Sequence, residues 1–291
     1  MATETPDVNP LSNCRLAFIG CGVMAEAIVA GLLRKKLVGP DQIVGSHPRE
    51  ARREEMHVKY GIEMFEQNRE AVLEVSPGAE TPDVASMVIL AVKPQRLHRV
   101  LEELKGSLHQ EQLVISVIAG ARIQTIADHL LHASVVRAMP NTPAQVGEGM
   151  TAWTASSEVS EKQATQVRAM LNALGKSVQV ENERQIDMAT ALSATGPTYI
   201  FMVMEALVDA GVHMGFSRHV AQELVHQMML GSVLFAIESH KHPAELRNMV
   251  TSPGGTSAEA IYQMEKGSLR TVLSKAVWAA YQRAQSLGEK I

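Results

Sequence analysis

The first half of the chain alternates between short apolar runs and longer segments with helical periodicity. Ser86–Val92 and Gln112–Ala119 are almost continuously apolar, which is typical of strands covered on both faces of a parallel sheet. The predicted strands are Arg15–Gly20, Gln42–Ser46, Glu63–Phe65, Ser86–Val92, Gln112–Ala119 and Ser134–Met139, with one or two more expected at Gly149–Ala155 and Ser177–Val180. The helices predicted between them are Val23–Lys36, Arg49–Tyr60, Arg69–Val75, Gln95–Lys105, Ile123–Leu131 and Glu161–Leu174. This alternation predicts a doubly wound α/β domain.

After Gln185 the strand signals end and long helical patterns follow. The predicted helices are Pro197–Met214, Arg218–His240, Pro243–Val250, Ser257–Lys266 and Leu269–Leu287. So few helices leave much of their apolar surface uncovered. We therefore expect this all-α domain to pack against another subunit.

Composition and charge exclude several function classes. With 291 residues the chain can form two domains, and its net charge of −4 argues against nucleic acid as a main partner. The best candidate for a membrane span, Tyr199–Gly215, is interrupted by Glu205 and Asp209 and is too short, so no membrane partner is expected.

Cys14 and Cys21 flank the first strand, and an extended chain would hold them about 23 Å apart. Such a pair cannot form a disulfide, and this favours a reducing, cytoplasmic location.

A glycine motif follows the first predicted strand. Gly20 to Ala25 reads G-x-G-x-x-A and lies between a strand and a helix, as in dinucleotide-binding turns. Gly20 suits the tight turn, Gly22 lets the backbone approach a pyrophosphate, and Ala25 is small enough for the helix to pack on the strand. An ordinary strand-to-helix turn is the alternative, but the context of the motif favours a nucleotide site.

The end of the second strand favours NADP(H). Sites specific for NAD place an acid there, whereas this chain has Ser46, followed by Arg49 and Arg52. The hydroxyl and the guanidinium groups could bind a 2′-phosphate; alternatively Ser46 caps a helix and the arginines are solvated. We predict NADPH as the cofactor and NADH as a weaker alternative. Ala91–Gln95 and Val117–Gly120 end the next strands and should line the same crevice, with Lys93 in a binding role rather than a chemical one.

The segment Thr251–Ser257 predicts an anion site. Its glycines leave backbone N–H groups open directly before a helix, and the hydroxyls of Thr256 and Ser257 would strengthen binding of a carboxylate. A helix cap with a Pro-Gly turn is the alternative.

The eleven histidines show no metal-ligand pattern, since His240 and His242 lack further ligands nearby, and no metal site is expected.

Together these motifs resemble the pyrroline-5-carboxylate reductase family. The matching segments are Phe18–Ala25, Ala91–Gln95, Arg137–Pro143, Ser193–Tyr199, Thr251–Ser257 and Glu265–Arg270. The resemblance extends from Arg15 to about Leu287. The chain departs from the usual S-G-S-G-P-A-Y at Ala194, Thr195 and Thr198, and it has Ser257 where the family often has threonine.

The resemblance implies a Rossmann domain followed by a helical domain that intertwines with a partner, in homodimers that often assemble into decamers. With it we divide the chain into a disordered tail at 1–14, an NADP(H)-binding Rossmann domain at 15–182 and an α-helical substrate-binding and dimerisation domain at 183–291. The implied reaction is reduction of 1-pyrroline-5-carboxylate to L-proline with NAD(P)H, the last step of proline biosynthesis.

Site residues carry over by position. The implied nucleotide contacts are Ile19, Gly20, Cys21, Gly22, Val23, Met24, Ser46, Asn68, Ala91, Val92, Lys93, Pro94, Val117, Ile118 and Ala119, to which the cofactor argument adds Arg49. Glu183, Gly255, Thr256 and Ser257 are expected at the substrate. A protonated cyclic imine is already electrophilic and needs mainly positioning, so Thr195, Glu183 or water could be the proton source.

Two other functions stay open from the residues alone. One is a related imine or hydroxy-acid dehydrogenase of similar two-domain design, which for a hydroxy acid would want a Lys or His acid within Asp187–Met214, where only His213 is present. The other is a non-catalytic NADPH-binding regulator, which would not need the anion site at Thr251–Ser257.

Overall fold

The computed structural model describes residues 9–77 and 84–288, and their contacts divide into two compact units. The first unit runs to Thr195 and takes up the chain again from Ala280, whereas the second is Gly196–Ala279. The domain boundary expected at 182/183 stays a prediction.

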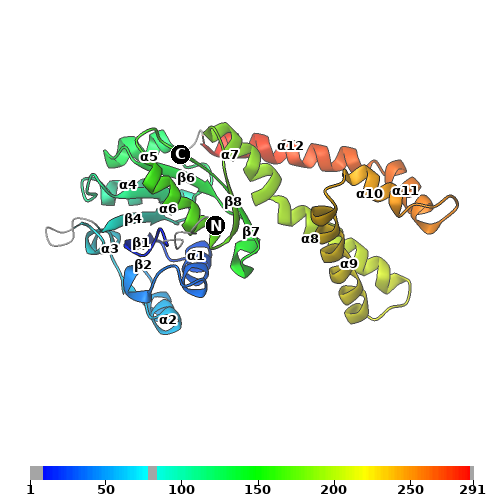
Figure 1. Ribbon diagram of the computed structural model, residues 1–291, viewed down its shortest axis with the longest axis horizontal. Coiled ribbons are helices and arrows are strands. Elements are labelled where there is room, and N and C mark those ends of the chain that lie inside the picture. Colours follow the sequence, from blue (N-terminus) through cyan, green and yellow to red (C-terminus); the bar gives the residue numbers. More distant parts are fainter. Residues whose placement is uncertain (1–8, 78–83, 289–291) are drawn as a thin grey trace, which may run out of the picture. The chain divides into compact units, whose positions relative to one another are not determined.

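A doubly wound sheet forms the centre of the first unit (Figure 1). Its strands are β1 (Cys14–Ile19), β2 (Ile43–Ser46), β3 (Glu63–Phe65), β4 (Ala85–Leu90), β5 (Leu113–Ser116), β6 (Val135–Met139), β7 (Gly149–Ala155) and β8 (Gly175–Gln179). The order in the sheet is β3-β2-β1-β4-β5-β6-β7-β8, and β1 to β6 are parallel. The order reverses at β1, which lies between β2 and β4 and creates the crevice where such sheets bind ligands. The predicted fold class is confirmed.

The last two strands run opposite to the others. β7 pairs antiparallel with β6, with Ala138 opposite Trp153, and β8 pairs parallel with β7. Only a short 3-10 turn at Thr142–Val146 connects β6 to β7, which is too short for a parallel crossover, so the chain must turn back. Helix α6 (Glu161–Asn172) provides the crossover to β8.

Helices cover both faces of the sheet. Besides α6, the first unit contains α1 (Val23–Arg34), α2 (Glu50–Tyr60), α3 (Asn68–Glu74), α4 (Leu97–Leu104), α5 (Ile123–Leu130) and α7 (Glu183–Ala189). Alternate residues of β1 point to opposite faces: Leu16 and Phe18 pack in one core with α1 and α6, and Ala17 and Ile19 pack in another with α3, α4 and α5. Burial on both faces explains why the strands read as continuous apolar runs.

Residues 9–14 do not belong to a disordered tail, contrary to the sequence expectation. The side chain of Leu11 is fully buried in the core shared with α1, and Asn9 Nδ2 donates to the carbonyl of Leu37 at 2.7 Å. Gln42 Nε2 also donates to the carbonyl of Cys14 at 2.8 Å. One buried leucine and side-chain hydrogen bonds give no periodic signal, so the pattern could not reveal this order. Residues 1–8 lie outside the described residues.

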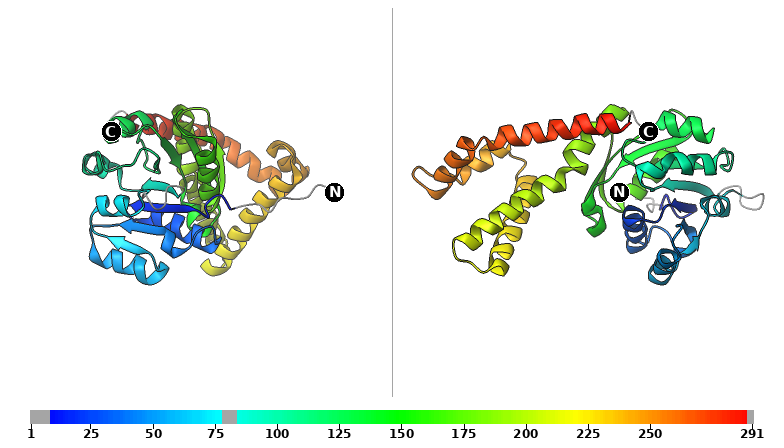
Figure 2. Two further views of the ribbon diagram at one scale, coloured as in Figure 1. Left: turned by 60° about the vertical axis from the view of Figure 1, so that its left-hand side comes forward. Right: turned by 180° about the vertical axis from the view of Figure 1, so that it is seen from behind.

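The second unit is helical. It contains α8 (Gly196–His213), α9 (Arg218–Ser239), α10 (Pro243–Met249), α11 (Thr256–Lys266) and the first part of α12 (Leu269–Gly288). Helices α8 and α9 run side by side (Figure 2) and share a small core of Val208, Ala221 and Val225. Many large apolar side chains of this unit are exposed, including Phe201 at 57% and Trp278 at 61%.

Two helical stretches, Glu183–His213 and Arg218–Ser239, are long and apolar enough to cross a membrane by length and composition alone. The expectation that Tyr199–Gly215 is too short was wrong in this respect, because the helix continues on its amino-terminal side to Glu183.

Candidate functional site

The glycine turn after β1 has the geometry of a pyrophosphate site. Gly20 has φ +86°, and a Cβ there would lie 2.5 Å from Val92 Cγ1. Gly22 is the N-cap of α1 without a side-chain cap, and a Cβ on it would meet no atom within 4 Å. The Glu26 N–H is bonded within the helix, to the carbonyl of Gly22 at 2.9 Å, which leaves the preceding N–H groups of the first turn open to an anion. The residues present therefore fit a dinucleotide.

Ser46 and Asn68 meet at the carboxyl end of β2. Ser46 is fully buried, and its Oγ lies 2.7 Å from Oδ1 of Asn68, to which it donates. Asn68 begins α3, and its Nδ2 donates to Oε2 of Glu103 at 3.0 Å. Arg49, the N-cap of α2, is exposed just beyond the strand. The structure thus brings together Ser46 and Asn68, which were both predicted to contact the nucleotide, and places Arg49 shortly after the same strand.

The Arg52 side chain binds the glycine turn and two neighbouring carboxylates. Its Nε donates to the carbonyl of Cys21 at 2.9 Å, and its guanidinium pairs with Glu26 at 2.5 Å and Glu55 at 2.7 Å. This leaves Arg49 as the candidate for a 2′-phosphate and makes Arg52 a support of the turn. Burial by itself would raise the pKa of Glu26, but hydrogen bonds from Lys59, Arg52 and Tyr60 outweigh it and lower that pKa to about 2.

The other predicted nucleotide residues lie at the ends of neighbouring strands. Ala91 follows β4, and its N–H donates to the carbonyl of Ile19 at the end of β1, 2.9 Å away. Val117 follows β5, and its N–H donates to Leu90 at 3.1 Å. Lys93 is exposed and is the N-cap of the 3-10 turn at Pro94–Arg96. Segments 91–94 and 117–119 therefore continue the crevice that begins at the glycine turn.

Glu183 belongs to a charged cluster that the sequence did not reveal. Its Oε1 accepts from Nη1 of Arg137 at 3.1 Å and from the N–H of Ile123, the first residue of α5, at 3.0 Å. Arg137 is 2% exposed, and its Nη2 pairs with Oδ1 of Asp187 at 2.6 Å. The only signal was one arginine inside an otherwise apolar strand. A buried cation needs such partners, so the cluster holds α7 against β6.

Thr195 lies at an irregular turn of helix. Residues Thr190–Ala194 form a π-helix, and both the N–H and Oγ1 of Thr195 donate to the carbonyl of Thr190 at 2.9 Å. Single π turns occur often at functional sites. Asn141 connects the segment to β7, because its Nδ2 donates to Ser193 at 3.3 Å and its Oδ1 accepts from the N–H of Met150 at 2.9 Å.

The predicted anion loop belongs to the second unit. Gly254 has φ +70°, and the Gly255 N–H donates to the carbonyl of Ser252 at 3.0 Å. A Cβ on Gly255 would lie 2.5 Å from Ser252 Oγ and 3.2 Å from the Ser252 carbonyl oxygen, so a larger residue there would have to displace the Ser252 side chain. Gly255 is also the N-cap of α11 without a side-chain cap, which leaves the N–H groups of Thr256 and Ser257 at an open helix start. These residues and Glu183 belong to different units.

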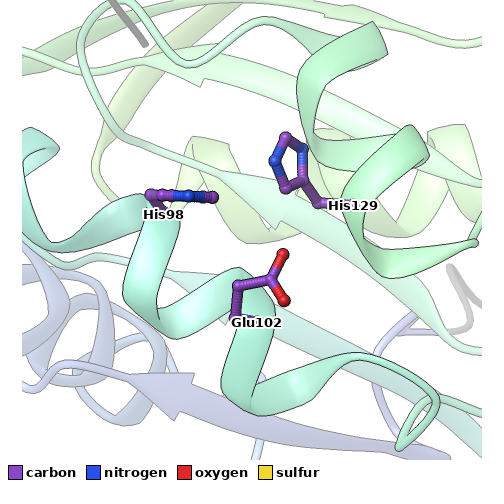
Figure 3. Close-up of side chains that lie close together, drawn as sticks. All are labelled: His98, Glu102 and His129. Atoms are coloured by element: carbon purple, nitrogen blue, oxygen red, sulfur yellow. The ribbon is translucent and has the colours of Figure 1, made fainter.

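The expectation that the chain has no metal site stays a prediction, but the fold brings together one group of residues that the spacing along the chain did not show. His98 and Glu102 of α4 and His129 of α5 bring ligand atoms within 4.8 Å of one another (Figure 3). The spacing along the chain could not show this, because the third residue comes from the next helix.

An open glycine turn at the switch point of a doubly wound sheet, in a chain with a separate helical unit, defines a two-domain dinucleotide-binding protein. Residues 15–120 match the family model described as NADP oxidoreductase, coenzyme F420-dependent, and residues 183–287 match the model described as pyrroline-5-carboxylate reductase dimerisation.

Individual relatives match nearly the whole chain. The pyrroline-5-carboxylate reductase of Synechocystis sp. is 40% identical over 96% of this chain and 100% of its own length. A pyrroline-5-carboxylate reductase structure from Coxiella burnetii is 36% identical with a TM-score of 0.83, covering 95% of this chain and 98% of that one. The Plasmodium falciparum enzyme, solved with NADP bound, is 28% identical with a TM-score of 0.84, covering 96% and 99%. The chain belongs to the pyrroline-5-carboxylate reductase family, as the motifs indicated.

Proposed function

We propose that this protein reduces 1-pyrroline-5-carboxylate to L-proline with NADPH, the final step of proline biosynthesis. The observation that supports this most directly is the open glycine turn at α1 in a chain whose relatives carry that activity in their names. When bound, NADPH would supply the hydride that converts the protonated imine of the substrate into the amine of proline, with NADP⁺ as the other product.

The chain's own residues would bind and orient the two reactants. The first turn of α1 would hold the pyrophosphate. The 2′-phosphate end would be held by Ser46, Asn68 and Arg49, and the segments after β4 and β5 would hold the rest of the nucleotide. The exposed Arg49 favours NADPH, since its guanidinium can form charge-assisted hydrogen bonds to a phosphate that NADH lacks.

The carboxylate of the substrate would bind the start of α11. There the N–H groups and hydroxyls of Thr256 and Ser257 are donors at a positive helix end. Both groups that contact Glu183 Oε1 are donors. The Glu183 carboxylate is therefore suited to accept a hydrogen bond from the substrate ring rather than to give a proton. The Thr195 hydroxyl carries a proton but donates it to Thr190, so it would have to turn to serve the substrate.

The assembly we propose is a homodimer through the helical unit, which can associate further into a decamer, in the cytoplasm. The match of residues 183–287 to a dimerisation model and the exposed apolar side chains of α8, α9 and α12 support the dimer. Two buried, unpaired cysteines suit a reducing compartment.

A coupled assay tests the proposal. The purified protein receives NADPH and 1-pyrroline-5-carboxylate as sole substrates; the fall in NADPH absorbance is compared with L-proline formed, and we expect one proline for each NADPH. Parallel reactions contain a hydroxy acid with NADP⁺, or an isomeric imine. Turnover only in those reactions would identify a different dehydrogenase, and NADPH binding without any turnover would identify a regulator.

A further inference from the structure

We propose that the surface formed by α4 and α5 binds one divalent transition-metal ion of the zinc class. The ligands are His98 and Glu102 of α4 and His129 of α5, which point toward one another in Figure 3. Within residues 9–77 and 84–288, this is the one group of three or more His, Cys, Asp or Glu side chains with metal-binding spacing. None of the three belongs to the proposed nucleotide or substrate site, so this inference is independent of the proposed function.

The two helices hold the ligands in place. His98 and Glu102 are four residues apart and therefore lie on one face of α4. Beneath them Leu97 and Leu101 of α4 and Ile126 of α5 are fully or almost fully buried in the same core. The rings of His98 and His129 meet edge to face with centroids 5.2 Å apart. The spacing of the ligands is thus set by a packed helix pair, not by mobile side chains alone.

His129 is already oriented as a metal ligand. Its Nδ1 lies 2.8 Å from the backbone carbonyl oxygen of Thr125. A carbonyl only accepts, so Nδ1 must carry the proton, and the lone pair of the neutral ring is then on Nε2. Metal-bound histidines typically have their other nitrogen bonded in this way, which fixes both the tautomer and the ring orientation.

The donor set selects the kind of ion. Two imidazoles and one carboxylate suit Zn²⁺ and similar ions better than Mg²⁺ or Ca²⁺, which prefer oxygen ligands. Ligand atoms on a tetrahedral zinc ion are about 3.4 Å apart, given Zn–N distances near 2.1 Å. Here they lie within 4.8 Å, and His98 and Glu102 are exposed, so small side-chain rotations close the site. Three protein ligands leave the fourth position to water.

Metal titration of tag-free protein, stripped with a chelator and then dialysed, tests the site. We expect one equivalent of Zn²⁺ to bind with micromolar affinity by calorimetry and to raise the thermal midpoint by several degrees. Co²⁺ should give the visible bands of a low-symmetry site without thiolate charge transfer, because Cys14 and Cys21 are buried. His129→Ala and Glu102→Gln should each weaken Zn²⁺ binding at least tenfold.

The matched control is His219→Ala. His219 and Glu223 of α9 form an i, i+4 pair like His98 and Glu102, with His219 Nε2 3.7 Å from Glu223 Oε1. They belong to no three-residue group among the described residues. This variant should bind Zn²⁺ like wild type. Unchanged NADPH affinity in all variants checks that they are folded, and His98→Ala replaces any variant that is not. No binding by wild type, or equal affinity in wild type and the folded site variants, would overturn the proposal.

Discussion

At the scale of single residues, the two glycines of the nucleotide turn have different tasks. Gly20 is required by the fold, because its positive φ and its distance to Val92 exclude a side chain. Gly22 has an ordinary backbone conformation and open space around the position of a Cβ. The fold itself does not need this open space, so its role is to let the pyrophosphate of a bound nucleotide approach the backbone at the start of α1. The two positions therefore separate folding from binding.

We expect Gly20→Ala to lower stability and Gly22→Ala to lower NADPH affinity. A left-handed conformation costs an alanine about 1–2 kcal/mol, before any clash with Val92. Alanine at Gly22 should change stability by only about 1 kcal/mol, since it is a poorer N-cap, but should weaken NADPH binding about tenfold or more by keeping the pyrophosphate from the N–H groups. Thermal unfolding and NADPH fluorescence titration measure the two effects. Wild-type NADPH affinity in Gly22→Ala would mean that the pyrophosphate lies elsewhere.

Arg49 should decide between the two nicotinamide cofactors. A charge-assisted hydrogen bond contributes about 1.5–3 kcal/mol, so Arg49→Ala should lower kcat/KM for NADPH about tenfold or more and leave kcat/KM for NADH nearly unchanged. Arg15→Ala is the control of equal charge, because Arg15 pairs with Glu74 near the amino end of β1, away from the crevice. An unchanged NADPH/NADH ratio in Arg49→Ala would remove Arg49 from the site.

At the scale of helices and strands, the local sequence pattern predicted the elements well, but it did not predict contacts between residues far apart in the chain. Glu63–Phe65 and Gly149–Ala155 are strands over the predicted residues, and the nucleotide turn has the conformation that its glycines indicated. The π turn at Thr190–Ala194 could not be predicted, because five residues are too short a stretch to show a period that differs from that of an α-helix. The cluster around Arg137 joins groups 46 and 50 residues apart, which only the folded chain brings together.

The loop before α11 should recognise the carboxylate. Pyrroline, which lacks that group, should be reduced with kcat/KM lower by about 10²–10⁴, the loss of two charge-assisted hydrogen bonds. Thr256→Val with Ser257→Ala should cause a smaller loss with the natural substrate, because the backbone donors survive, and should leave NADPH affinity almost unchanged. Thr165→Val with Ser157→Ala makes the same chemical change at exposed positions of the first unit. Equal losses for both imines in the loop variant would assign the loop to folding.

At the scale of the whole molecule, the exposed apolar surface of the helical unit requires a partner. Helix α9 alone exposes Leu230, Val233, Leu234 and Phe235 at 48–58%. Fully burying a side chain of this kind stabilises by about 1.5–3 kcal/mol. A handful of such side chains therefore offsets the loss of translational and rotational freedom on association, about 4–15 kcal/mol. Either a second copy of the chain or a membrane would cover this surface. The match to a dimerisation model favours the second copy.

We therefore expect an obligate dimer that forms in aqueous buffer without detergent. Sedimentation at low micromolar concentration should give no monomer, and flotation with phospholipid vesicles should leave the protein in the aqueous fraction. Leu234→Glu places a charge among the exposed apolar side chains of α9 and should shift the protein toward monomer with loss of activity. Val58→Glu is the control, because Val58 of α2 is 74% exposed but belongs to the first unit, and it should change neither property. An active wild-type monomer would contradict the dimer, and vesicle-bound protein would show that α8 and α9 are covered by lipid instead.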